Sequence, residues 1–156
     1  MSKAHVNLLI LLDIYVKIES KDFRKEYFMH EKVLGASLPS AMALAYLGDA
    51  RHSLYIRRML VEMGISKSGE LNEMALQYVT AKGQAEAMRK IEHLLLPDEL
   101  EVYKRAANSG HLNRPRNASA ADYRAATGFE AVIGMLTYIG DEERVDELLS
   151  AAYAEN

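Results

Sequence analysis

The stretch AYLGDA, residues 45–50, places a glycine and an aspartate inside an apolar run. A Gly-Asp pair usually marks a turn, but a turn here would divide a well-patterned helix that starts after Pro39 and ends near Gly64. Helix neighbours lie three and four positions away. For Asp49 they are Ala45, Tyr46, His52 and Ser53. Because none of them is a Lys or Arg, the carboxylate must find its partner elsewhere in the chain.

A second acid raises the same question in GFEAVIG, residues 128–134. The spacing of Phe129, Val132, Ile133 and Leu136 predicts the buried face of a helix. Glu130 lies beside that face and also lacks a cation three or four positions away. Glycines weaken a helix interior, so Gly128 and Gly134 predict the close approach of another helix.

Three explanations fit two such acids. Each could form a tertiary salt bridge with one of the 19 Lys and Arg residues, or could simply face solvent. Alternatively, the two could share a divalent cation, as carboxylates from facing helices do in other proteins. Taken alone, the two residues favour the ordinary explanations over a metal site.

Composition limits the class of protein. The chain has 156 residues, 49% hydrophobic and 26% charged, which is typical of one globular domain. It contains no cysteine, which excludes thiol catalysis and suits a reducing cytoplasm. The most apolar segment, residues 6–16, is shorter than the roughly 20 residues that a membrane helix needs. We therefore expect a soluble, cytoplasmic protein without a membrane role.

Charge is unevenly distributed. The net charge of −3 argues against a strongly basic nucleic-acid binder, but residues 103–121 contain four cations and no acid. Such a basic stretch can bind phosphate groups even in an acidic chain.

No segment alternates between apolar and polar residues, so the sequence predicts an all-α fold. Helix start and stop signals predict helices over residues 4–18, 22–34, 40–64, 68–95 with a break near Thr80, 97–108, 119–138, and after Gly140. Residues 108–118 are rich in Asn, Gly, Arg and Pro and predict a loop.

Four motifs together resemble one family. They are AYLGDA at 45–50, VTAKGQA at 79–85, YKRAANS at 103–109 and YRAATGFEAVIGML at 123–136. Their order and spacing resemble the ribonuclease III catalytic domain, and most of all its short bacterial form, Mini-ribonuclease III, which lacks a double-stranded-RNA-binding domain. The resemblance covers about residues 38–153. It implies one catalytic domain, residues 38–156, after an N-terminal helical extension, residues 1–37.

The chain also departs from the family pattern. Two further acids of classical ribonuclease III would fall at Ala45 and Thr127, although the Mini branch also lacks the first and can carry Thr at the second. Arg51, His52 and Ser53 replace the apolar residues and Glu that usually follow the signature aspartate. These three differences are expected to change the local surface next to the predicted metal site.

The resemblance implies an endoribonuclease that needs Mg²⁺, or Mn²⁺ as a substitute, and cleaves double-stranded RNA rather than DNA. It assigns Asp49 and Glu130 as the catalytic, metal-binding residues, with 5′-phosphate and 3′-hydroxyl products. It further implies a homodimer that matures the ends of the 23S ribosomal RNA precursor. A ribosomal protein is a further candidate partner.

The same resemblance, together with local charge, suggests a set of RNA-binding residues. They are Lys82, Gln84, Lys104, Arg105, Asn108, Arg114, Arg116, Tyr123 and Arg124. For any one basic residue in this set, a solvated surface charge is an equally good explanation. Two other functions compete with the nuclease: an inactive ribonuclease III fold that binds structured RNA or a ribosomal partner, and a helical interaction protein whose acids form ordinary salt bridges.

Overall fold

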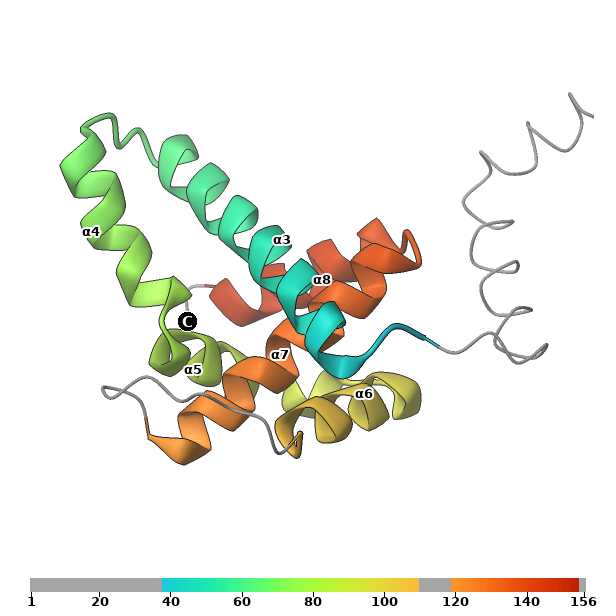
Figure 1. The fold of residues 1–156 in the computed structure, drawn as a ribbon. Helices are drawn as coiled ribbons and strands as arrows, with labels where there is room; N and C mark the ends of the chain where they lie inside the picture. The colour runs from blue at the N-terminus through green and yellow to red at the C-terminus, as the bar shows by residue number, and fades with distance from the viewer. Residues whose placement is uncertain (1–37, 110–118, 155–156) are drawn as a thin grey trace, which may run out of the picture.

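A computed structural model describes residues 38–109 and 119–154 of the chain (Figure 1). Within this part there are helices and no strands, as the sequence predicts. The elements are α3 (Ala41–Glu62), α4 (Ser68–Val79), α5 (Ala81–Ile91), the short 3-10 helix η1 (Glu92–Leu94), α6 (Pro97–Ala107), α7 (Ala120–Tyr138) and α8 (Glu142–Tyr153).

Most helix starts follow from local side-chain chemistry. The hydroxyl groups of Ser40, Thr80 and Ser119 each accept a hydrogen bond from the backbone N–H three residues later, which caps α3, α5 and α7. Pro97 begins α6, where its missing N–H costs nothing. The predicted break near Thr80 is confirmed, since Thr80 is extended and separates α4 from α5.

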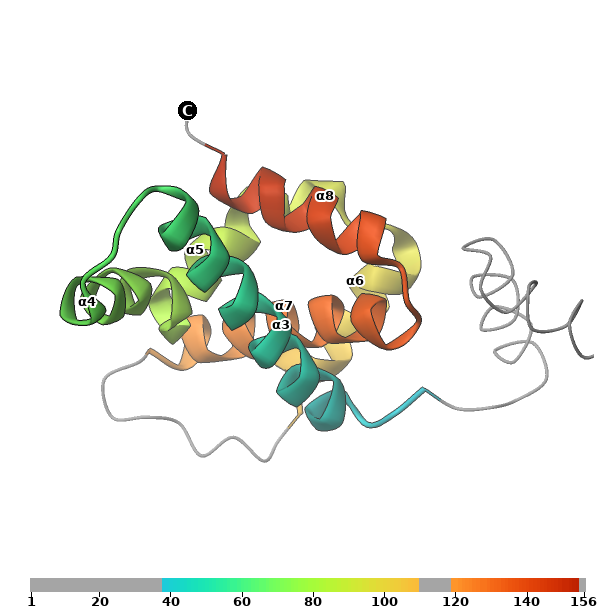
Figure 2. The same ribbon diagram turned by 90° about the horizontal axis from the view of Figure 1, so that it is seen from above.

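Helix α7 forms the centre of the fold. It packs against α3, α5, α6 and α8, and its residues from Ala126 to Leu136 are buried, except for Glu130, which is half-buried. Figures 1 and 2 show α3 crossing this central helix, with α8 on one side of the crossing. The buried face predicted around Phe129 is confirmed. Any side chain on α7 therefore has a well-defined place in the molecule.

Helix α3 presents a different face to the core than its apolar residues suggest. The most obvious apolar stripe includes Leu54 and Val61, which are each 60% exposed. The buried stripe instead consists of Leu44, Gly48, His52, Ile56 and Leu60, spaced four residues apart. A glycine and a histidine in this stripe hide its core character from a hydrophobicity pattern, and the more apolar face is left exposed in the described structure.

A buried ion pair joins α6 to α8. Arg144 donates hydrogen bonds to both oxygens of the Glu99 carboxylate, at 2.9 and 3.0 Å, and a third to the Leu94 carbonyl oxygen. Glu99 is only 2% exposed, so its charge is matched inside the fold. This pair fixes the two helices that flank the central one.

Some predictions fall outside the described part of the chain. They are the N-terminal helical extension, residues 1–37, and two members of the RNA-binding set, Arg114 and Arg116, in the 110–118 segment. Among the described helices, none is both long enough and apolar enough to cross a membrane.

Candidate active site

The glycine beside Asp49 is required by a helix crossing. A Cβ atom on Gly48 would fall on the Glu130 carbonyl oxygen of α7 and 2.8 Å from the Gly134 backbone nitrogen. A Cβ atom on Gly134 would fall on the Leu44 carbonyl oxygen of α3. The two helices therefore cross with their backbones in contact, and only glycine fits at either position. The prediction that Gly134 marks a close helix approach is confirmed.

Gly128 has the same role toward α6. A Cβ atom there would collide with the ring of Tyr103. Helix α7 is thus held against α3 and α6 at two glycines, one on each side of Glu130. These contacts fix the backbone around Glu130 relative to α3 and α6.

The crossing brings the two anomalous acids together. Asp49 follows the α3 glycine and is exposed, whereas Glu130 on α7 is half-buried. Burial raises the pKa of the Glu130 carboxyl group to about 7; a hydrogen bond with the Gln84 side chain opposes this shift, and the charge of Asp49 adds to it. A carboxylate that resists ionisation in this way is stabilised when a cation binds between the two acids.

Neither acid has a basic partner in the described part of the chain. Across residues 38–109 and 119–154, the ion pairs of Lys and Arg side chains go to other acids. The salt-bridge explanation of Asp49 and Glu130 therefore finds no support among these residues. No group of three or more His, Asp or Glu residues that could hold a metal occurs there either. A metal ion at this site would have two protein carboxylates and would take its other ligands from water or substrate.

Gln84 differs from the other residues in the RNA-binding set. It is 2% exposed and hydrogen-bonds the Glu130 carboxyl group. Its amide nitrogen also lies 3.4 Å from Nδ1 of His52. The side chain therefore contacts the acid and offers little surface to a bound duplex.

His52 lies in the core and not at the site surface. It is fully buried, and burial lowers the pKa of its imidazole to about 4, so the ring is neutral near pH 7. Its Nε2 atom lies 2.6 Å from the Tyr153 hydroxyl oxygen of α8. The sequence pattern missed this role, although the four-residue spacing of His52 from Gly48 and Ile56 is a signal that could have found it.

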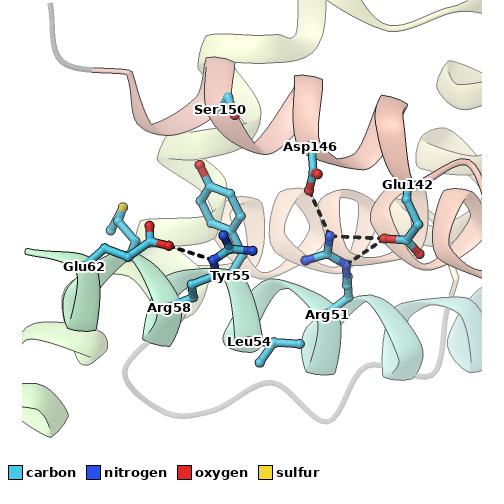
Figure 3. A pocket seen from close by; sticks show the side chains of 9 residues that line it. Arg51, Leu54, Tyr55, Arg58, Glu62, Glu142, Asp146 and Ser150 are labelled. Atoms are coloured by element: carbon cyan, nitrogen blue, oxygen red, sulfur yellow. Dashed lines mark hydrogen bonds and ion pairs between the residues drawn. The ribbon is translucent and has the colours of Figure 1, made fainter.

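Arg51 is directed away from Asp49. Figure 3 shows its guanidinium group between Glu142 and Asp146 of α8, with N–O distances of 3.1 and 2.9 Å. The groove around it has a volume of about 560 Å³ and is lined by residues of α3 and α8, none of them in the candidate site. A positive charge after the signature aspartate is therefore neutralised by the neighbouring helix and does not reach the carboxylates.

The remaining described members of the RNA-binding set lie on three helices. Lys82 is exposed in the first turn of α5, and Tyr123 and Arg124 lie in the first two turns of α7. Lys104, Arg105 and Asn108 are exposed at the end of α6. This end lies next to the start of α3, because the Ser109 hydroxyl donates to Met42 Sδ at 3.6 Å.

An all-α fold that brings acids from two crossing helices together belongs to a class of helical domains that can build a metal site between facing helices. Comparison with known proteins identifies the family. The sequence pattern of the ribonuclease III domain matches residues 42–141, and the chain belongs to this family.

Curated relatives extend the match over most of the chain. A Mini-ribonuclease 3 from Streptococcus pneumoniae is 40% identical over 120 residues, which is 76% of this chain and 94% of that protein. Mini-ribonuclease 3 proteins from Brevibacillus brevis (76% and 88% covered) and Clostridium tetani (80% and 85% covered) are 40% and 34% identical, respectively. A crystal structure of a protein from Fusobacterium nucleatum, 32% identical, matches with a TM-score of 0.66 over 71% of this chain and 88% of that one.

Proposed function

We propose that this protein is a Mg²⁺-dependent endoribonuclease that cleaves double-stranded RNA, with Asp49 and Glu130 as its catalytic, metal-binding residues. Family membership carries the enzyme class: the chain is an endoribonuclease, a hydrolase. The observation that carries the site is the Gly48–Gly134 crossing, which brings two acids together without a basic partner among the described residues.

The donor set fits a hard divalent cation. Magnesium prefers oxygen ligands and usually retains several waters, and two carboxylates leave positions for those waters and for phosphate oxygens. When bound, the ion would acidify water and neutralise charge on the scissile phosphate. Mn²⁺ would serve as a substitute. The protein supplies the fixed spacing of the two carboxylates, and Asp49, being exposed, supplies the side that faces the substrate.

Recognition of a duplex requires phosphate and ribose contacts, because side chains cannot read the narrow A-form major groove. Exposed cations on α5, α6 and the start of α7 suit that task. We assign phosphate contacts to Lys82, Lys104, Arg105 and Arg124, with Asn108 and Tyr123 as neutral contributors. Arg114 and Arg116, outside the described residues, complete the proposed set.

We also propose that the protein works as a homodimer through the exposed face of α3. Tyr46 is 84% exposed and lies on the same face as Leu54 and Val61. Apolar surface of this kind is typical of an interface between subunits. Tyr46→Lys is expected to convert a dimer to a monomer in sedimentation velocity, whereas Leu76→Lys, which replaces an exposed leucine of α4, is not.

The proposed natural substrate is the 23S ribosomal RNA precursor, processed in the cytoplasm where ribosomes assemble, with a ribosomal protein as a candidate helper. This part of the proposal rests on the family resemblance. A transcript carrying the paired ends of the precursor should be cut at one position on each strand, and an unrelated duplex of equal length should be cut more slowly.

The central test uses a labelled RNA duplex with purified protein, in Mg²⁺ or in EDTA. Cleavage is expected only with metal. Asp49→Asn and Glu130→Gln should each lower its rate by about a thousandfold or more, the effect of losing several kcal/mol of transition-state stabilisation. Glu73→Gln, an exposed carboxylate on α4, is the matched control and should cleave normally.

The outcomes separate the competing functions. Cleavage that survives both substitutions would contradict the site. Binding of the duplex without cleavage, unaffected by EDTA, would support the inactive scaffold in place of the enzyme. With Arg51 paired to α8 and His52 buried, the described structure offers no observation that favours that scaffold.

A further inference from the structure

A chain of hydrogen bonds connects α8 to Glu130 through two buried side chains. It contains one residue from each of four helices: Tyr153 of α8, His52 of α3, Gln84 of α5 and Glu130 of α7. The distances are 2.6 Å from the Tyr153 hydroxyl oxygen to His52 Nε2 and 3.4 Å from His52 Nδ1 to the Gln84 amide nitrogen. The Gln84 side chain hydrogen-bonds the Glu130 carboxyl group.

The direction of these bonds follows from what each group can donate. The bond from Gln84 stabilises the ionised form of Glu130, so an amide N–H points at the carboxylate. The second N–H of the same amide points at Nδ1 of His52. Nδ1 must then be the acceptor nitrogen of a neutral ring, and Nε2–H donates to the Tyr153 hydroxyl oxygen.

Packing holds the imidazole in this orientation. The His52 ring meets the edge of Phe129 with centroids 5.3 Å apart and an interplanar angle of 85°. It also stacks on Tyr153 at 5.7 Å and 26°. Tyr153 is itself held by Tyr55, which stacks on it at 6.1 Å, and by Tyr78, which makes an edge contact at 5.6 Å. A ring enclosed in this way cannot turn to present a different nitrogen to Gln84.

Helix α5 starts at a fixed place, and this positions the amide. Thr80 caps the helix by accepting from the Gly83 N–H, and a Cβ atom on Gly83 would collide with the backbone of Gln77. The residue after that glycine is Gln84, so its backbone is held against α4. No buried side-chain nitrogen or oxygen atom in the described part of the chain lacks a hydrogen-bond partner.

We propose that His52 and Gln84 are positioning residues for the candidate metal site, and that His52 acts through the Gln84 amide to orient the Glu130 carboxylate. This inference rests on the proposed function. Without an acceptor at Nδ1, the amide is free to rotate and turn its carbonyl oxygen toward the carboxylate, where it repels the charged form. Mutation of residues that hydrogen-bond to metal ligands commonly lowers metal affinity by about 10- to 100-fold.

The test compares His52→Phe with the wild-type protein. Phenylalanine keeps a buried ring but removes both nitrogens. A Mg²⁺ titration of RNA-free protein, followed by the ¹³C shift of the Glu130 side-chain carboxyl group, is expected to move to about tenfold higher Mg²⁺. In cleavage assays kcat at limiting Mg²⁺ should fall while KM for the duplex stays within about twofold, because the RNA surface is untouched.

Two further variants separate hydrogen bonding from packing. Asparagine places an oxygen close to the position of Nδ1, so His52→Asn should recover part of the Mg²⁺ affinity lost in His52→Phe. Tyr153→Phe keeps the stacked ring and should have a smaller effect than His52→Phe. Ile91→Val, a buried change on α5 outside the chain of bonds, is the control for general loosening of the core and should leave the titration unchanged.

Each outcome has a clear meaning. If wild-type protein cuts the duplex with Mg²⁺ and His52→Phe titrates like it, the positioning role is wrong and the proposed function stands. If the wild-type Glu130 carboxyl group does not respond to Mg²⁺ even when cleavage occurs, the metal site itself is wrong. If His52→Phe does not fold, Tyr153→Phe and His52→Asn decide, since a Mg²⁺ affinity equal to that of the wild-type protein in both variants would overturn the proposal.

Discussion

Glu99 on α6 and Glu130 on α7 are both withdrawn from solvent, but only Glu99 has a guanidinium group beside it. Arg144 binds both oxygens of the Glu99 carboxylate and joins two helices. Glu130 receives an amide N–H and lies near a second acid, with no Lys or Arg paired to it in the described part of the chain. The first acid stabilises the fold at its own site, whereas the second remains available for a ligand that the fold does not provide.

The largest loss of stability is expected when Glu99, the acid paired with Arg144, is removed. Glu99→Ala leaves Arg144 partly buried without its main partner, and we expect a loss of about 4 kcal/mol in the free energy of unfolding. Urea denaturation measures this loss. Glu101→Ala, an exposed acid of the same helix, should change stability by less than about 0.5 kcal/mol. A loss below about 1 kcal/mol for Glu99→Ala would mean that the ion pair does not hold α6 and α8 together.

The helix crossing is the next most sensitive feature. Gly48→Ala should cost about 3 kcal/mol, because the added methyl group meets main-chain atoms that cannot move aside as a side chain can. Thermal unfolding measures the effect, and cleavage should fall with it as the two acids separate. Gly69→Ala on α4 has nothing within 4 Å and should instead stabilise the protein by about 0.5 kcal/mol. Equal stability of the two variants would contradict the close crossing.

Glu130 and His52 should both affect how the stability of the protein depends on pH. His52 binds a proton below about pH 6.5 when unfolded but only below about 4 when folded, so its contribution to stability is lost as pH falls from 6.5 to 4. Glu130 retains its proton up to about pH 7 when folded but only to about 4.5 when unfolded, so its contribution is lost as pH rises through that window.

Between about pH 4.5 and 6.5, His52 makes the free energy of unfolding rise with pH and Glu130 makes it fall. The two effects oppose each other, so this pair should change the stability of metal-free wild-type protein little in that range. Glu130→Gln removes the opposing effect, so its free energy of unfolding should fall by about 2.5 kcal/mol on acidification across this window, because of His52 alone. His52→Phe should expose the opposite slope, with stability rising on acidification. Denaturation at a series of pH values measures both. Parallel curves for the two variants would contradict the opposed pKa shifts.

The smallest expected effect concerns Arg51. Its partners Glu142 and Asp146 are largely exposed, so Arg51→Ala should cost less than about 1 kcal/mol. Cleavage should stay within about twofold of wild type, because the guanidinium group points to α8 (Figure 3). A large loss of activity with unchanged stability would show that this arginine does influence the carboxylate site.

Helix positions could be predicted because their signals are local. Ser40, Ser119 and Pro97 mark helix starts through their own chemistry, and the glycine-bearing motifs gave both the family and the two acids. The faces of α3 were harder to predict. Leu54 and Val61 dominate a hydrophobicity pattern although they face outward, whereas Gly48 and His52 contribute little to it although they face inward.

The chain of hydrogen bonds that ends at Glu130 could not be predicted from the sequence, for a different reason. Tyr153, His52 and Gln84 come from three segments of the chain and meet only after four helices have packed. His52 stood out in the sequence as a departure from the family pattern at the metal site. Its actual surroundings depend on long-range packing, to which local spacing gives only an indirect guide.

Backbone contact between α3 and α7 has a consequence for the evolution of the site. With no side chain between Gly48 and Gly134, main-chain atoms alone set the separation of the two acid-bearing segments. Residues elsewhere in the core can drift in size and shape without changing that separation, while these two positions are confined to glycine. Active-site geometry and the packing of the rest of the protein are therefore free to diverge at different rates.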